Sequence, residues 1–252
     1  MKIRLLTTGF KSAYENMAID EAVLVHSQKN HQSTLRFYGW RPAAISIGYF
    51  QSLKEEVDMN ECQKQQVDYI RRVTGGGAVF HEAEVTYSLI SPVDGQFIPQ
   101  DIISSYKKIC QGIIEGLKIL GIESQFVPLN DIIASGKKIS GNAQTRKKNV
   151  LLQHGTILLD VNVEKMFSLL KVPQEKLRDK LIKDVKQRVV GVKNLLLSKQ
   201  INFETCQEAL VKGFEKALML EYDKTSLTAS ELAMAQELKD KKYSLPEWNL
   251  MR

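Results

Sequence analysis

Apolar residues recur at helical spacing in some segments of the chain and alternate with polar residues in others. In residues 13–27 the apolar positions fall on one side of a helix. Ser12, directly before them, has the side chain of an N-terminal helix cap. A second apolar stripe predicts a helix over residues 101–120, and residues 54–66 are expected to form a polar helix. From about residue 160 onward the pattern is mostly helical.

Short runs rich in β-branched and aromatic residues are typical of strands. They read "KIRLLTTG", "TLRFYGW", "AAISIGYF" and "VTYSLISP". A meander of "NDIIAS", "KKISGNAQTR" and "VLLQHGTILLD" follows, with turns at Gly136 and at residues 147–149. Because the strands cluster early and are joined by short turns, we predict an α+β fold with a mixed, largely antiparallel central sheet flanked by helices. We expect residues 1–252 to form a single domain.

Composition is that of an ordinary globular protein, with 43% hydrophobic and 25% charged residues. No apolar run reaches the roughly 18 residues that a membrane span needs, and the N-terminal segment lacks the pattern of a signal peptide. We therefore predict a cytoplasmic protein with no membrane partner. The formal net charge is +6, which favours phosphates or an acidic protein partner. Without a recognisable nucleic-acid-binding module, we do not expect nucleic acid as a partner.

The three cysteines, Cys62, Cys110 and Cys206, are scattered and form no CxxC pair. Disulfides and a cysteine-based zinc site are therefore not expected. The chain also contains no HxxxH metal pair and no serine in a GxSxG elbow. We expect no metal held by protein side chains alone.

Three adjacent glycines, Gly75 to Gly77, stand between a pair of arginines and a histidine in "RRVTGGGAVFH". Glycine in regular structure costs about 0.5–1 kcal/mol relative to alanine, so three in a row require a reason. A hairpin with a bulge is one interpretation. The other is a backbone loop that lies against a ligand, since arginine suits phosphate or carboxylate and the N–H groups of such a loop can bind an anion.

Two further stretches carry candidate chemistry. Lys137 and Lys138 are adjacent on a predicted strand, so their side chains point to opposite faces and one can enter a pocket. The small residues 140–143 leave room beside that lysine. His154 stands within an apolar strand, where a histidine is more often part of a wall than a base.

Together, "RRVTGGGAVFH", then "NDI" followed by "GKKISGNAQ", then "LLQHGTILLD", resemble the lipoate–protein ligase A family in order and spacing. The preceding "TLRFYGWRPAAISIGYFQ" is similar to the family's earlier strands, and the likeness runs from about residue 3 to "KYSLPEWN". The resemblance implies the catalytic fold that biotin and lipoate protein ligases share.

The resemblance also implies an ATP-dependent, AMP-forming ligase. Lipoate and Mg-ATP would give lipoyl-AMP, and a lysine of an acceptor domain would then take the lipoyl group. ATP and Mg²⁺ are thus the expected cofactors and lipoate the substrate. The expected partner is the lipoyl domain of a glycine cleavage H protein or of a 2-oxoacid dehydrogenase E2 component.

Site residues follow from the same resemblance. The family's nucleotide-contacting arginine falls on Arg72 and its essential lysine on Lys138. Its glycine-rich ligand loop falls on Gly75, Gly76, Gly77, Ala78, Val79 and Phe80. We expect Tyr38, Val79 and the strand with His154 to form walls of an acyl slot, where each buried CH₂ contributes about 0.8 kcal/mol.

The chain departs from the family in two places. Longer relatives carry a small C-terminal accessory domain that we expect to be absent here, so a separate accessory subunit could be a partner. The family's loop that closes over the adenylate corresponds to "QRVVGVKNL", in which Arg188 and Asn194 keep their places in a looser pattern.

Two other functions stay open. An ATP-independent octanoyl or lipoyl transferase of the same fold would move the acyl group between proteins through a thioester. We expect such an enzyme to need a nucleophilic thiol in the pocket, yet the segment "GIESQFVPLNDI" contains no cysteine. A non-catalytic lipoyl-binding protein is the second alternative, which the lysine at position 138 disfavours.

Overall fold

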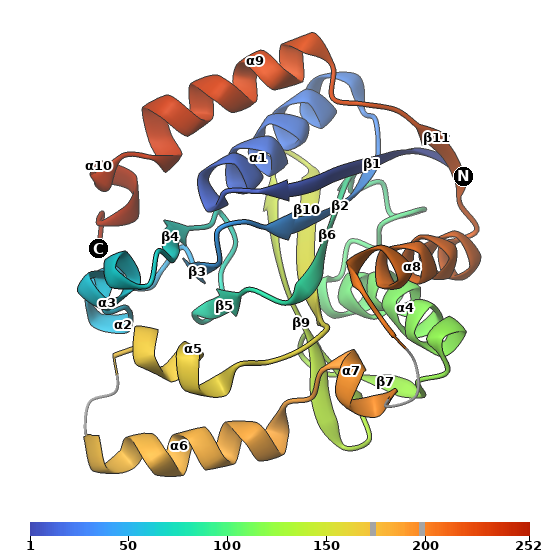
Figure 1. Ribbon diagram of the computed structural model, residues 1–252. Helices are drawn as coiled ribbons and strands as arrows, with labels where there is room; N and C mark the ends of the chain where they lie inside the picture. The colour runs from blue at the N-terminus through green and yellow to red at the C-terminus, as the bar shows by residue number, and fades with distance from the viewer. Residues whose placement is uncertain (172–174, 197–199) are drawn as a thin grey trace.

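A mixed sheet of eight strands runs through the centre of the molecule (Figure 1). The computed structural model describes residues 1–171, 175–196 and 200–252, with the backbone alone for residues 175–179. In spatial order the strands are β11 (Glu221–Lys224), β1 (Lys2–Lys11), β2 (Thr34–Trp40), β6 (Glu84–Pro92), β10 (Val150–Leu158), β9 (Lys137–Lys147), β8 (Asp131–Ala134) and β7 (Ser124–Val127). Strand β1 is parallel to both its neighbours, and the other pairings are antiparallel. The predicted α+β fold is confirmed.

A smaller sheet stands beside the large one. Its strands, in order, are β4 (Asp68–Arg71), β3 (Ala44–Ile47) and β5 (Val79–His81). Strand β3 ends before the predicted "AAISIGYF" does, because Gly48 begins a turn in which its N–H donates to the Gln51 side chain. This turn packs against the glycine loop that joins β4 to β5.

Helices cover both faces of the large sheet (Figure 1). They are α1 (Ala13–Asn30), α2 (Leu53–Glu56), α3 (Met59–Lys64), α4 (Ile102–Leu120), α5 (Val163–Leu169), α6 (Glu175–Arg188), α7 (Val192–Leu195), α8 (Phe203–Leu218), α9 (Ala229–Leu238), the π-helical turn η1 (Lys239–Tyr243) and α10 (Pro246–Asn249). None of the helices in the described ranges is long and apolar enough to cross a membrane.

Alternation along the strands separates the two faces. On β2, Leu35 and Phe37 belong to the apolar core under α4 and α8, whereas Arg36 and Tyr38 point to the face covered by α1. Successive residues of a strand point to opposite sides, so the sequence pattern of this strand determines which residues can reach the helix α1. The face under α1 also holds the polar groups described below.

Helix boundaries follow local capping. Ser12 caps α1 through a capping box with Glu15, as predicted. The polar helix expected over residues 54–66 is instead two helices, α2 and α3. Val57 between them is extended and bridges to Leu170, and the Asp58 side chain accepts from the N–H of Glu61 to begin α3.

Helices α4 and α8 cross with their backbones in contact. A Cβ atom on Gly213 would lie 2.2 Å from the backbone nitrogen of Gly116. Glycine on both helices therefore permits an approach that any side chain would prevent. This packing closes the core on the side of the sheet away from α1.

The C-terminal segment returns to the start of the chain. Strand β11 pairs with β1, and α9 packs along α1 (Figure 1). Near the C-terminus, Arg71 of β4 donates hydrogen bonds to Trp248 and Asn249, and the Trp248 indole N–H donates to the Arg71 carbonyl. The strand that leads into the glycine loop is thus tied to the last helix, α10.

Candidate active site

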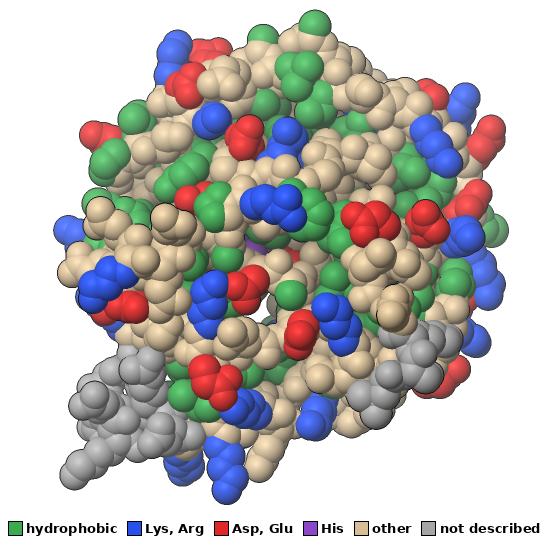
Figure 2. Space-filling model, viewed as in Figure 1, with side chains coloured by type: hydrophobic (Ala, Val, Ile, Leu, Met, Phe, Trp, Pro, Cys, Tyr) green, Lys and Arg blue, Asp and Glu red, His purple; other side chains and the backbone are tan. Residues whose placement is uncertain are grey.

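A cavity of about 380 Å³ lies between the large sheet, the small sheet and the glycine loop. Helix α1 lies at its inner end, and α5 and α6 border it from the other side. Apolar side chains supply much of its wall, among them Tyr38, Trp40, Val79, Phe80, Met166 and Val189. Figure 2 shows this face hollowed near its centre, with histidine visible inside and basic and acidic side chains mixed around it.

Lys138 stands at the more exposed side of the cavity. Its Nζ lies 2.7 Å from Oδ1 of Asp131, and its side chain is 41% exposed. A Cβ atom on Gly141 would lie 2.9 Å from Cε of Lys138, so the lysine side chain occupies the space above that glycine. A register shift opposite Ile139 leaves one extra residue in β9, and such bulges redirect neighbouring side chains.

The glycine loop requires glycine for its shape at one position. Gly76 has φ +98°, and a Cβ atom on Gly48 would lie 2.0 Å from the Gly76 carbonyl oxygen. A Cβ atom on Gly75 or Gly77 would meet no atom within 4 Å. The absence of a side chain at these two positions therefore leaves open space beside the loop. A loop that lies against a ligand would require such space.

Arg72 lines the cavity, but its hydrogen bonds go to the protein's own oxygens. The guanidinium donates to the Thr74 hydroxyl at 3.1 Å, to the Ser46 carbonyl at 3.1 Å and to the carbonyls of Gly75 and Gly77 at 2.8 Å. Burial lowers the pKa of Arg72 to about 10. Arg72 thus holds the glycine loop in place through hydrogen bonds to the loop's backbone carbonyls.

Asp20 of α1 receives donors at both carboxylate oxygens. Oδ1 accepts from Arg36 at 2.6 Å and from Ser88 at 2.8 Å, and Oδ2 accepts from Tyr38 at 3.0 Å. Burial favours the neutral acid, but Arg36 and His154 together lower the pKa of Asp20 below its ordinary value. The carboxylate behind the inner end of the cavity is therefore buried with both of its oxygens hydrogen-bonded.

His154 connects this carboxylate to the glycine loop. Its Nδ1 lies 3.5 Å from Oδ2 of Asp20, and its Nε2 lies 2.7 Å from the Thr74 hydroxyl. Burial lowers the pKa of His154, although Asp20 acts in the opposite direction. A neutral ring beside a carboxylate carries its proton on Nδ1, so Thr74 donates to Nε2. His154 is accordingly a wall residue with a defined tautomer.

A second histidine lies on the opposite wall. His81 places Nδ1 2.6 Å from Oε1 of Glu84 and Nε2 2.8 Å from the Ser46 hydroxyl. Trp40 stacks on its ring at 4.0 Å, and the Trp40 Nε1–H donates to Thr86, which in turn donates to Glu84. Ser46, His81 and Glu84 are hydrogen-bonded in the same sequence as a nucleophile, a base and the carboxylate that orients the base.

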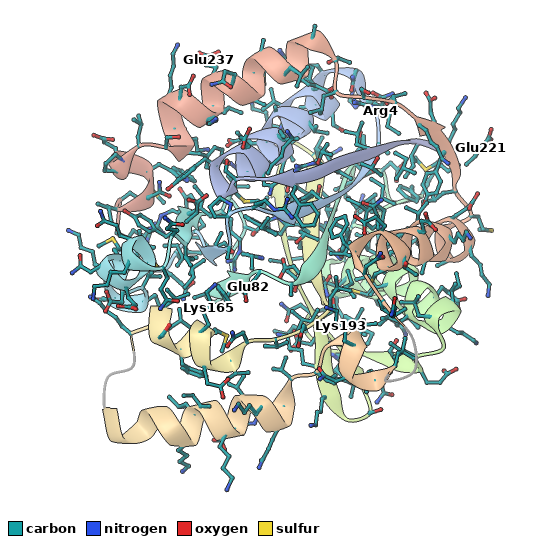
Figure 3. The ribbon with its side chains drawn as sticks, viewed as in Figure 1. Arg4, Glu82, Lys165, Lys193, Glu221 and Glu237 are labelled. Atoms are coloured by element: carbon teal, nitrogen blue, oxygen red, sulfur yellow. The ribbon has the colours of Figure 1, made fainter. Side chains whose placement is uncertain are left out.

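Two ion pairs hold the helices beside the cavity. Lys165 of α5 points toward Glu82, which directly follows β5 (Figure 3), with Nζ 2.5 Å from Oε1. Lys186 of α6 pairs with Glu164 of α5. Val189, directly after α6, bridges to Lys138. Helices α5 and α6 therefore form one connected side of the cavity.

Most residues predicted for the site come together at this cavity. Arg72, Gly76, Gly77, Ala78, Val79, Phe80, Lys138 and His154 line it, and Gly75 lies next to the lining in the same loop. Asn194 instead caps α7, where its side chain accepts from the N–H of Gly191, and Arg188 is exposed at the end of α6. The roles given to the lining residues stay predictions.

Sequence reasoning missed Asp20, Thr74, Asp131 and the pair of His81 and Glu84. The spacing of His81 and Glu84, three residues apart in "HEAE", was a signal that we could have used. Asp131 is part of the "NDI" motif itself. Asp20 gave no local signal, because its partners come from β2, β6 and β10.

Comparison with known proteins identifies relatives along the whole chain. The model of the lipoyl protein ligase A/B catalytic domain matches residues 12–215. "Octanoyltransferase LipM" of Geobacillus kaustophilus is 38% identical, with 99% of this chain and 98% of that protein aligned. A solved structure from a bi-partite lipoate protein ligase of Thermoplasma acidophilum has a TM-score of 0.91 and 33% identity, covering 99% of this chain and 96% of that one. Lipoate–protein ligase A bound with ATP has a TM-score of 0.85 and 30% identity, with 99% of each chain covered.

The expected ATP-dependent, AMP-forming ligase, with ATP and Mg²⁺ as cofactors and an adenylate intermediate, is corrected by these comparisons. Relatives with the octanoyltransferase name, from several organisms, are 34–38% identical over nearly the whole chain. A transferase receives its acyl group already activated, so the reaction needs no ATP. The cysteine-free segment "GIESQFVPLNDI" favoured the ligase interpretation, and the octanoyltransferase relatives overturn that conclusion.

Proposed function

Because the chain belongs to the lipoyl protein ligase A/B catalytic-domain family, we propose that it is an ATP-independent octanoyltransferase. It moves an octanoyl group from the thioester of a carrier protein to the lysine of a lipoyl domain. The observation that carries the proposal is the apolar cavity with Lys138 at its exposed side. The octanoyltransferase names of the full-length relatives support it.

In this proposal the cavity holds the acyl chain and Lys138 acts on the carbonyl. Aromatic and aliphatic walls suit an eight-carbon chain, at about 0.8 kcal/mol for each buried CH₂. Attack on a thioester places negative charge on the carbonyl oxygen, and a fixed cation stabilises that charge. Lys138 supplies such a cation beside the small Gly141.

The partners are two proteins. The acceptor is the lipoyl domain of a glycine cleavage H protein or of a 2-oxoacid dehydrogenase E2 component, and the donor is a carrier protein. The net charge of +6 favours an acidic donor. We place the reaction in the cytoplasm, with residues 1–252 acting as one domain. We considered an accessory subunit because a ligase must close over its adenylate. A transferase forms no adenylate, so this subunit is not part of the proposal.

The test incubates the purified chain with an octanoyl carrier protein and an unmodified lipoyl domain, without ATP. Intact-protein mass spectrometry should detect the octanoyl lipoyl domain. A parallel reaction with free octanoate and Mg-ATP should give none. Product that forms only in the reaction with ATP would overturn the proposal.

Lys138→Ala should remove the cation from the reacting carbonyl. We expect kcat/KM for octanoyl transfer to fall by about 10²–10³, as for the loss of one oxyanion donor. Lys137→Ala is the matched control, because Lys137 is the neighbouring lysine on β9 and does not line the cavity. Circular dichroism should show both variants folded. Equal rates for the two variants would remove Lys138 from the mechanism.

A further inference from the structure

A chain of buried hydrogen bonds runs behind the cavity, on the face of the large sheet that packs against α4 and α8. Nε2 of Gln153 donates to the Tyr87 hydroxyl at 2.7 Å, and this hydroxyl donates to Oδ1 of Asn142 at 2.7 Å. The three residues lie on β10, β6 and β9, and none is more than 4% exposed. Hydrogen bonds are stronger in such a buried setting than in water. The Asn142 amide is therefore held in one orientation.

Gly155 makes the contact between Tyr87 and Asn142 possible. It lies opposite Tyr87 on one side and opposite Asn142 on the other. A Cβ atom at this position would lie 2.1 Å from Oδ1 of Asn142 and 2.9 Å from Cε1 of Tyr87. Any side chain on residue 155 would thus push the amide away from the hydroxyl.

Asn142 carries this order to Asn130, the residue directly before β8. Both the backbone N–H and Nδ2 of Asn142 donate to the Asn130 carbonyl oxygen, at 3.0 and 2.9 Å. The Asn130 side chain donates in return to the Asn142 carbonyl. Three hydrogen bonds between two residues therefore hold the end of the turn that joins β7 to β8.

The next residue, Asp131, is the partner of Lys138. Its Oδ1 lies 2.7 Å from Nζ of Lys138, and the two side chains are 34% and 41% exposed. A partly exposed ion pair contributes little by itself, because holding a long side chain in one geometry costs conformational entropy. The position of the Lys138 ammonium group therefore depends on how firmly the carboxylate is held. Asn142 holds the backbone next to that carboxylate.

We propose that Asn142 is a positioning residue for octanoyl transfer, which fixes the start of β8 and, through Asp131, the ammonium group of Lys138. This inference rests on the proposed transferase function. Asn142 borders the cavity, but its amide group is bound to Tyr87 and Asn130. It acts through Lys138 and not by touching the acyl group. No annotated motif is needed for this role, since it follows from the hydrogen bonds alone.

A double-mutant cycle tests whether Asn142 acts through the lysine. Asn142→Ala should lower kcat for octanoyl transfer by about 10–100-fold, the scale of a reacting group misplaced by about 1 Å. KM for the lipoyl domain should stay within about threefold, because the lost interaction belongs to the transition state. In a Lys138→Ala background the same substitution should cost less than about threefold, since coupled residues are not additive. An equal fold loss in both backgrounds would overturn the inference.

Chemical modification of Lys138 gives a readout that needs no activity. The chain is acetylated briefly with acetic anhydride, and tandem mass spectrometry measures the ratio of modified Lys138 to modified Lys137. Asp131→Asn, which removes the carboxylate, should raise this ratio and sets its upper value. Asn142→Ala should raise the ratio toward that value. A wild-type ratio in Asn142→Ala would show that the lysine is held without this residue and would overturn the inference.

Tyr87→Phe is a milder variant that removes one hydroxyl and keeps the ring. We expect the same direction of change as in Asn142→Ala, with kcat lowered by about 3–10-fold because one hydrogen bond to the amide is lost. Tyr222→Phe is the matched control, since it loses a hydroxyl that donates to the Val211 carbonyl at 2.9 Å, and it should keep the wild-type kcat. If Asn142→Ala does not fold, wild-type kcat and labelling ratio in Tyr87→Phe overturn the inference. A wild-type chain that transfers no octanoyl group overturns the proposed function, and the labelling ratio then still tests the positioning of Lys138.

Discussion

Hydrogen-bond donors surround the buried carboxylate of Asp20. A substitution that removes this carboxylate tests how much the burial of those donors depends on its charge. Arg36 is fully buried and forms its ion pair with Asp20. Asp20→Ala would leave this guanidinium without its counter-charge, so we expect the free energy of unfolding to fall by about 3–5 kcal/mol. Urea denaturation at neutral pH measures the change. Glu237→Ala removes an exposed ion pair with Lys241 and should change stability by no more than about 0.5 kcal/mol.

The neutral state of His154 predicts a pH dependence. Burial lowers the pKa of His154 in the folded protein, whereas an unfolded histidine titrates near 6.5. As the pH falls below about 6.5 the unfolded chain binds a proton that the folded chain does not, so stability declines. His154→Gln should reduce this decline between pH 7.5 and 5.5, measured by urea denaturation. An unchanged slope in His154→Gln would contradict the prediction.

At the scale of elements, the contact between α4 and α8 depends on glycine. Alanine in place of Gly213 would gain about 1 kcal/mol of helix propensity. Its Cβ would also lie 2.2 Å from the Gly116 nitrogen, a backbone atom that cannot rotate away. Overpacking costs about 1–3 kcal/mol and sometimes more, so we expect Gly213→Ala to be less stable than wild type in guanidinium denaturation. The exposed Lys212→Ala on the same helix should change little, and a Gly213→Ala variant as stable as Lys212→Ala would show that the helices can separate.

Elements with a regular apolar pattern could be predicted from the sequence, and those that depend on tertiary contacts could not. The helix after Ser12 and the meander from β8 to β10 follow local periodicity and turn residues. Strand β11 has the polar sequence "EYDK" and becomes a strand by pairing with β1. In the site, the motifs indicated Lys138 and the glycine loop. The bulge beside Lys138 and the contacts of Asp20 arise from the packing of distant segments.

At the scale of the whole molecule, the C-terminal helix supports the site from a distance. The Asn249 side chain accepts from the Arg71 N–H at 2.9 Å, and Arg71 donates to carbonyls of the turn that begins at Gly48. Asn249→Ala leaves that N–H buried without a partner, which costs about 1–3 kcal/mol. Since this turn packs on Gly76, we also expect a lower kcat/KM for octanoyl transfer. Substitution of the exposed Glu247 of α10 by alanine should keep wild-type stability and rate. A wild-type rate of octanoyl transfer in Asn249→Ala would show that α10 does not support the site.

The pairing of β11 with β1 has a consequence during synthesis on the ribosome. Strand β1 is made well before its outer neighbour β11, because most of the sheet and its helices lie between the two strands in the sequence. At about 5–20 residues per second, the outer edge of β1 waits on the order of tens of seconds for its partner. Through that interval its backbone N–H and C=O groups are available to any other extended chain. The nascent protein is therefore open to misassembly at β1, and it loses this exposure when β11 leaves the ribosome and pairs with this strand.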